Sequence, residues 1–192
     1  MGVFEQLDKV FWPAGPKPNI WAVFDSARDK KLYQKIAYSG LLYECLFAGY
    51  LPAELQRTAP YLVQLEQDDR ASRKLLEESW DNSWCVFLDA DVGIKTLRKH
   101  LRTLLRVQGP SGKYMLFRYY DPRVLRVYLP TCRADELERF YGPIDRIWME
   151  EGLGSTQMLE FEVKKGKLEK KVFEAYVPDA VAAPAGDVPL VS

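Results

Sequence analysis

The chain has 192 residues, 47% of them hydrophobic, and a formal net charge of zero from 27 Lys and Arg against 27 Asp and Glu. This composition is typical of a globular protein, the zero balance disfavours a general nucleic-acid binder, and no apolar run approaches the ~20 residues that span a bilayer. One histidine beside 13% aromatic residues favours contacts over acid–base chemistry.

The N-terminal segment lacks the basic and then apolar regions of a secretory signal, because Glu5 and Asp8 lie there. The three cysteines form no CxxC pair, so reduced thiols and a cytoplasmic location are expected. Apolar residues recur at helical spacing from Phe4 to Phe11, and prolines then interrupt regular structure. We interpret residues 1–19 as a lead-in segment that carries a short amphipathic helix.

From residue 20 onward, short buried strands alternate with helices. Residues 20–24 are apolar, and Ser26 and Asp29 then have capping-box spacing before a helix that Gly40 terminates. Further strands are expected at 43–47, 61–65 and 84–88, and further helices at 52–59, 70–80 and 92–106. The alternation predicts an α/β fold class, with a mixed sheet and flanking helices in a lobe that spans residues 20–143.

A hairpin is predicted around the turn at 109–112, with residues 113–120 as its second strand. Alternate side chains of a strand face opposite ways. Tyr114 and Tyr120 would share one face and Tyr119 would lie on the other, so both faces carry bulky side chains. The strand is therefore either buried on both faces, which we favour, or presents one face to a partner.

The C-terminal part begins with a typical helix start, in which Asp121 is the N-cap and Pro122 the first helical residue. A second short helix is expected over 135–141. Later strands are expected at 144–149, 158–163 and 172–177. They predict a smaller strand-rich lobe over residues 144–177, either appended or forming an antiparallel edge of the sheet, and residues 178–192 are interpreted as a disordered tail.

Three carboxylates follow predicted strands and could form a metal site. Asp25, Asp89 and Asp91 could hold Mg²⁺, a cation that prefers oxygen ligands, if their strand ends meet at one edge of the sheet. A small Mg²⁺-dependent phosphoryl-transfer enzyme is therefore the alternative function. The simpler interpretation is that these residues satisfy free N–H groups at the starts of helices.

The predicted helix over 92–106 has a basic stripe beside its apolar face. Its cations are Lys95, Arg98, Lys99, Arg102 and Arg106. A solvated or internally paired face is the usual explanation, and an acidic protein partner or a nucleic acid are the alternatives.

No self-contained catalytic set is visible. Cys85 lies inside an apolar strand and is expected to be an inert thiol, and no local carboxylate could orient His100 as a base. Glycine-rich phosphate loops and GxSxG elbows are absent from the sequence. We therefore expect no enzymatic activity, no cofactor and no metal.

Six sequence blocks, in a fixed order over residues 20–145, resemble a known family. The most specific block is Phe117 to Leu125, an FR-x-YDPRVL pattern. The others are 21–29, 46–49, 59–63, 80–105 and 129–143, which includes Leu129-Pro130-Thr131 and Phe140-Tyr141-Gly142-Pro143. The chain is similar in these blocks to the type VI secretion effector adaptors, the Tap or TEC chaperones, a domain of unknown function usually encoded beside VgrG spike proteins.

This resemblance implies a cytoplasmic, non-enzymatic chaperone. Its partners would be one secreted effector toxin and the VgrG spike protein, with no nucleic acid and no membrane involved. The stretch after Glu150 matches no block, and its strand-forming character suggests an edge that could accept a cargo strand. Cargo choice is therefore expected in the exposed part of residues 144–177.

Eight side chains are candidates for partner contact. They are Arg118, Tyr120, Arg123, Ile147, Trp148, Phe161, Phe173 and Tyr176. For the two arginines, we favour pairing with a carboxylate inside the scaffold, and direct contact with a partner is the alternative.

Overall fold

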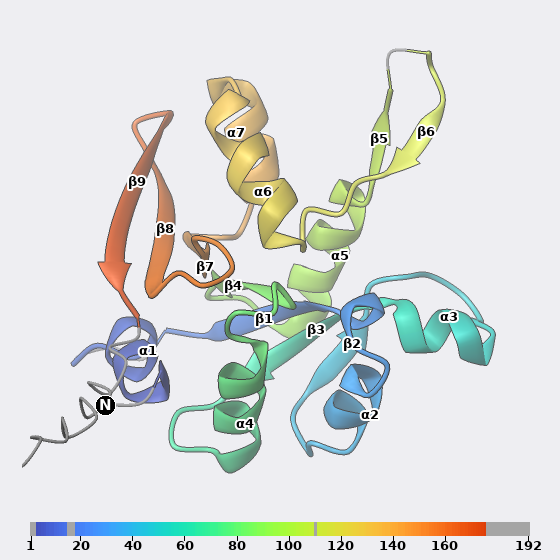
Figure 1. Ribbon diagram of the computed structural model, residues 1–192. Helices are drawn as coiled ribbons and strands as arrows, with labels where there is room; N and C mark the ends of the chain where they lie inside the picture. The colour runs from blue at the N-terminus through green and yellow to red at the C-terminus, as the bar shows by residue number, and fades with distance from the viewer. Residues whose placement is uncertain (1–2, 15–17, 110, 176–192) are drawn as a thin grey trace, which may run out of the picture.

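The computed structural model describes residues 3–14, 18–109 and 111–175 (Figure 1). The predicted tail at 178–192 lies outside these residues. The helices are α1 (Val3–Phe11), α2 (Leu32–Ala37), α3 (Ala53–Thr58), α4 (Arg70–Ser79), α5 (Ile94–Leu104), α6 (Pro122–Tyr128) and α7 (Ala134–Tyr141), with short 3-10 turns η1 (Ser26–Arg28) and η2 (Leu129–Thr131). The strands are β1 (Ile20–Asp25), β2 (Tyr43–Cys45), β3 (Pro60–Leu65), β4 (Cys85–Asp89), β5 (Arg106–Gln108), β6 (Tyr114–Leu116), β7 (Arg146–Glu150), β8 (Gln157–Lys164) and β9 (Lys167–Glu174).

Seven of the strands form one sheet, in the order β2-β3-β1-β4-β7-β8-β9. Its pairings are all antiparallel; Ile20 of β1, for example, lies opposite Leu65 of β3 on one side and Asp89 of β4 on the other. The predicted mixture of strands and flanking helices is confirmed. β7 pairs directly with β4, so the C-terminal strands extend the N-terminal sheet as an antiparallel edge.

Helices cover both faces of this sheet (Figure 1). In β1, Trp21 and Val23 pack into one buried cluster with α5, α6 and α7. Ile20, Ala22 and Phe24 pack into the other, with α1, α2 and α4. This period-two division follows from strand geometry. An antiparallel sheet commonly leaves one face wet, and burial of both faces explains the almost continuous apolar strands.

The lead-in helix α1 is part of this core. Leu7 and Phe11 are fully buried, and the Phe11 ring centroid lies 5.3 Å from that of Trp148. Within the described ranges, no helix has the length and apolar character needed to cross a bilayer.

The start of α2 differs from the prediction, because Ser26 and Asp29 do not form a capping box. The Asp25 carboxylate accepts a hydrogen bond from the Ala27 N–H (3.2 Å) and caps the 3-10 turn η1 instead. The Asp29 carboxylate accepts from the Lys31 N–H (2.7 Å), which delays the helix until Leu32. At α6 the prediction is confirmed: Asp121 is the N-cap and Pro122 opens the helix.

The predicted hairpin is present, but its second strand is shorter than 113–120. β6 covers only Tyr114–Leu116 and pairs with β5 in a separate two-stranded sheet. The chain then leaves the ladder: the Phe117 N–H donates to the Leu105 carbonyl, and a turn places Tyr119 and Tyr120 in the core. The hairpin projects from the body of the molecule (Figure 1).

Gly142 ends α7 at a position where a side chain has no room. Its φ is +50°, and an added Cβ would collide with the ring of His100, whose Nε2–H donates to the Phe140 carbonyl (2.8 Å). We expect Gly142→Ala to lower the free energy of unfolding by about 2 kcal/mol or more. Urea denaturation measures this change.

Gly40→Ala is the matched control for Gly142→Ala. Gly40 also has a positive φ, +81°, but nothing lies within 4 Å of an added Cβ. Gly40→Ala should lower the free energy of unfolding by about 1 kcal/mol, because only the conformational cost of a positive φ remains. Equal losses in the two variants would contradict the steric argument.

Candidate interaction surface

The three predicted metal-binding carboxylates do not meet. Because β1 and β4 are antiparallel, Asp25 lies at the opposite end of the strand pair from Asp89, which faces Ile20. The Asp89 carboxylate accepts from Arg146 (2.7 Å), and the Asp91 carboxylate accepts from Asn19 (3.0 Å). The alternative of a magnesium site at these three carboxylates is therefore wrong, and the described residues contain no cluster of three His, Cys, Asp or Glu side chains that could hold a metal ion.

Two buried aspartates hold two arginines at the start of α6. Arg118 bonds through Nη2 to the Asp25 carboxylate and lies 3.6 Å from that of Asp121. Arg123 binds Asp121 through two nitrogens, Nε at 2.9 Å and Nη2 at 2.6 Å. The carboxylates are buried, whereas the Arg118 and Arg123 side chains are 41% and 40% exposed. The FR-x-YDPR block thus joins β1 to α6 and presents two fixed guanidinium groups at the surface.

Burial and charge act in opposite directions on Asp121. Burial alone raises the pKa of its carboxyl, but the hydrogen bonds and charge of Arg123 and the charge of Arg118 outweigh it. The pKa therefore lies below its ordinary value of 3.8. Burial and the nearby Asp25 charge raise the pKa of Tyr120 to about 12, so its hydroxyl stays protonated.

Arg123→Met tests the Arg123–Asp121 pair. A depressed carboxyl pKa stabilises the fold above the unfolded pKa, and this contribution is lost as pH falls through the folded pKa. We expect the variant to lose about 1 kcal/mol or less at pH 7, because Arg123 is partly exposed. Acid denaturation should begin at higher pH in the variant, and the two curves should converge once the pH falls below the folded pKa of Asp121. A constant difference at all pH values would contradict the pairing argument.

Four of the eight predicted contact residues lie in the core. Tyr120, Ile147, Trp148 and Phe161 are at most 2% exposed, so no partner reaches them in this fold. The predicted role is not supported there, because helices cover both faces of the sheet. Phe173 is half-buried against the cluster of α1, α2 and α4. Arg118 and Arg123 remain at the surface, and Tyr176 lies outside the described residues.

The basic stripe of α5 lines a shallow groove. Arg98 is engaged, because its Nε donates to the Cys45 carbonyl (2.7 Å) and lies 3.5 Å from the Glu44 carboxylate. Lys95, Lys99 and Arg102 line the same groove, of about 310 Å³. Their side chains make no ion pair or hydrogen bond within the described part of the chain. Most of the stripe is therefore not internally paired.

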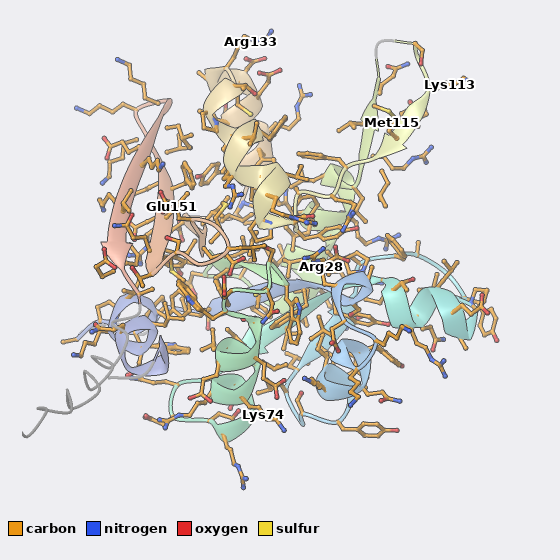
Figure 2. All side chains as sticks on the ribbon, in the orientation of Figure 1. Arg28, Lys74, Lys113, Met115, Arg133 and Glu151 are labelled. Atoms are coloured by element: carbon orange, nitrogen blue, oxygen red, sulfur yellow. The ribbon has the colours of Figure 1, made fainter. Side chains whose placement is uncertain are left out.

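The β5–β6 hairpin carries apolar side chains that are at least half exposed. Tyr114, Met115 and Leu116 are 65%, 52% and 51% exposed, on both faces of the ribbon. Figure 2 shows Met115 on the projecting hairpin, away from the sheet. The sequence favours burial of residues 113–120 on both faces, with contact between one face and a partner as the alternative, so these three residues are not among the eight predicted contacts. The available signal was the short turn at 109–112, because it predicts a two-stranded hairpin whose strands pair only with each other and can leave their side chains exposed.

The contacts of His100 and Cys85 indicate structural roles for both residues. The His100 ring bonds a backbone carbonyl, as described above. Cys85 is buried in β4, burial raises the pKa of its thiol strongly, and all three cysteines are free thiols. These surroundings do not activate either residue as a base or nucleophile.

Comparison with known proteins identifies the family. Residues 20–139 match the domain of unknown function DUF4123, which is more than half of the chain. The chain belongs to this family. DUF4123 is associated with adaptors of type VI secretion effectors, which agrees in part with the resemblance found in the sequence. No curated protein and no solved structure matches the chain.

The DUF4123 match ends within α7, so β7, β8 and β9 lie beyond it. Of these three strands β9 is the most exposed, and it forms one edge of the sheet. Lys167, Lys170 and Lys171 lie on this edge strand, and Lys171 pairs with Glu160 (2.8 Å). Lysines on an edge oppose indiscriminate pairing with other strands.

Proposed function

We propose that this protein is a cytoplasmic adaptor that binds one type VI secretion effector and helps to load it onto the VgrG spike. The observation that carries this proposal is membership of DUF4123, over residues 20–139. The adaptor has no enzymatic activity in this proposal. The structural roles of His100 and Cys85 support that part of it.

An adaptor needs surface outside its scaffold to distinguish one cargo from another. We place cargo choice in residues 144–177, whose most exposed described strand is β9. Within the described residues, β8 is the only strand that pairs with β9, so a cargo strand can pair with the other edge of β9 through its backbone. Acidic residues in that cargo strand would offset the lysine charges that oppose other partners.

Co-purification tests effector binding. The chain is co-expressed with the toxin encoded beside its gene, and a tag on one partner is used for capture. The two proteins should co-elute from a sizing column. Separate elution, together with normal toxin secretion from a strain that lacks this gene, would overturn the proposal.

A chimera tests where cargo is chosen. Residues 144–177 are exchanged for the same region of another DUF4123 protein that has a different effector. The chimera should capture the effector of the donor. If it still captures the original effector, recognition lies in residues 20–143.

A further inference from the structure

Unpaired positive charge is concentrated on one face of α5. Lys95, Lys99 and Arg102 line one groove, and their side chains have no anionic partner within the described residues. The chain as a whole has no net charge. These cations therefore give α5 a local excess of positive charge. A basic face of this kind attracts an acidic partner.

The β5–β6 hairpin continues this basic face with an apolar one. The Arg106 guanidinium lies over the Tyr114 ring, 4.6 Å from its centroid, and so joins the two parts. A two-stranded hairpin is at best marginally stable alone in water. Here its three apolar residues on β6 are at least half exposed, so they gain burial only when another surface covers them.

A second groove connects the hairpin to α6 and α7. It encloses about 420 Å³, and Thr103 lines both this groove and the basic one. Aromatic side chains of Phe117, Tyr128 and Phe140 form part of its wall. Among its charged residues, Arg106 and Arg139 outnumber the single acidic one, Glu136. The two grooves thus form a continuous surface that is basic at one end and aromatic at the other.

We propose that α5 and the β5–β6 hairpin bind one acidic amphipathic segment of the effector. Its carboxylates face Lys95, Lys99 and Arg102, and its apolar side chains cover Tyr114, Met115 and Leu116 and enter the aromatic groove. Charge complementarity selects an acidic partner, and the apolar hairpin selects a protein over a nucleic acid, whose phosphates would leave it uncovered. This inference rests on the proposed function, because it takes the effector as the occupant. It is a contact additional to the β9 edge.

The test measures the affinity of the purified full-length chain for the toxin encoded beside its gene, by calorimetry at low and high salt. Lys95→Glu/Lys99→Glu/Arg102→Glu should weaken binding at least about tenfold at low salt and flatten its salt dependence. Tyr114→Ser/Met115→Ser/Leu116→Ser should weaken binding at least about tenfold and keep the salt dependence. In the complex, hydrogen exchange should slow at residues 106–116.

Lys30→Glu/Arg70→Glu/Lys74→Glu is the matched control, because it reverses three exposed cations outside both grooves. It should bind within about twofold of the wild type. All variants should keep the wild-type unfolding temperature, since the changed side chains lie at the surface.

Three outcomes would overturn the inference, and they are distinguishable. If the wild type binds the toxin and both groove variants bind it equally well, the surface is wrong and the adaptor function stands. If the wild type binds no toxin, the proposed adaptor function and the proposed binding surface are both wrong. If charge reversal abolishes binding to a mixed-sequence DNA duplex and leaves toxin binding unchanged, the basic face is a nucleic-acid surface.

Discussion

Replacing Trp148 by alanine is expected to lower the free energy of unfolding by about 3–5 kcal/mol. The side chain is fully buried, its ring packs against Phe11, and its Nε1–H donates to the buried Glu160 carboxylate (2.8 Å). Alanine would leave a cavity between α1 and the sheet. It would also leave Glu160 with Lys171 as its remaining ion-pair partner. Chemical denaturation followed by circular dichroism measures the loss.

Two controls separate the packing of Trp148 from its hydrogen bond. Trp148→Phe keeps most of the apolar volume and removes the N–H donor, so it should cost about 1–3 kcal/mol. Val172→Ala changes a partly exposed residue of β9 and should cost about 0.5 kcal/mol or less. A Trp148→Ala variant that is as stable as the wild type but binds no effector would contradict the placement of Trp148 in the core.

Tyr119→Ala is expected to cost a similar amount, about 3–5 kcal/mol. The ring is 1% exposed and lies edge-on to Phe140 (6.0 Å between centroids), and its hydroxyl donates to the Leu101 carbonyl of α5 (3.0 Å). The substitution removes the ring and leaves that carbonyl without this donor. Denaturant unfolding gives the loss.

Tyr114→Ala is the matched control for Tyr119, because it changes the same residue type five positions earlier on the exposed hairpin. It should change stability by about 0.5 kcal/mol or less. Tyr119→Phe should cost about 1–2 kcal/mol, because only the hydroxyl is lost. Similar losses at positions 114 and 119 would mean that 113–120 is one buried strand, as the sequence favours, and would contradict this fold.

The central strands could be predicted from the sequence almost to the residue. Expected strands at 61–65 and 84–88 correspond to β3 (Pro60–Leu65) and β4 (Cys85–Asp89). They are visible because a strand buried on both faces is a short continuous apolar run. The direction of pairing is not visible, because such a run looks the same in a parallel and an antiparallel sheet. The alternative of a magnesium site was left open for this reason, and antiparallel pairing rules it out because it separates Asp25 from Asp89.

The roles of the surface arginines could be predicted only in part. The sequence indicates that Arg118 or Arg123 could pair with a carboxylate, and both do. Asp121 as the partner of Arg123 is a local feature, whereas Asp25 is 93 positions from Arg118 and meets it only through the fold.

The contact residues chosen in β7 and β8 could not be assigned from local pattern alone. Trp148 is buried partly because α1, from the other end of the chain, packs on it. The local sequence also fits two structures equally well: one long strand over 113–120, and a short hairpin strand that ends at 116. Only the core position of Tyr119 distinguishes them.

Effector secretion from a deletion strain tests the adaptor function most directly. The gene for this chain is deleted in frame, and the proposed cargo, an effector toxin encoded near it, is measured in the culture medium, with an unrelated effector of the same secretion apparatus as control. We predict that the neighbouring toxin is no longer secreted, that the control effector is unaffected, and that the wild-type gene in trans restores secretion. Secretion of the neighbouring toxin at the wild-type level would contradict this prediction.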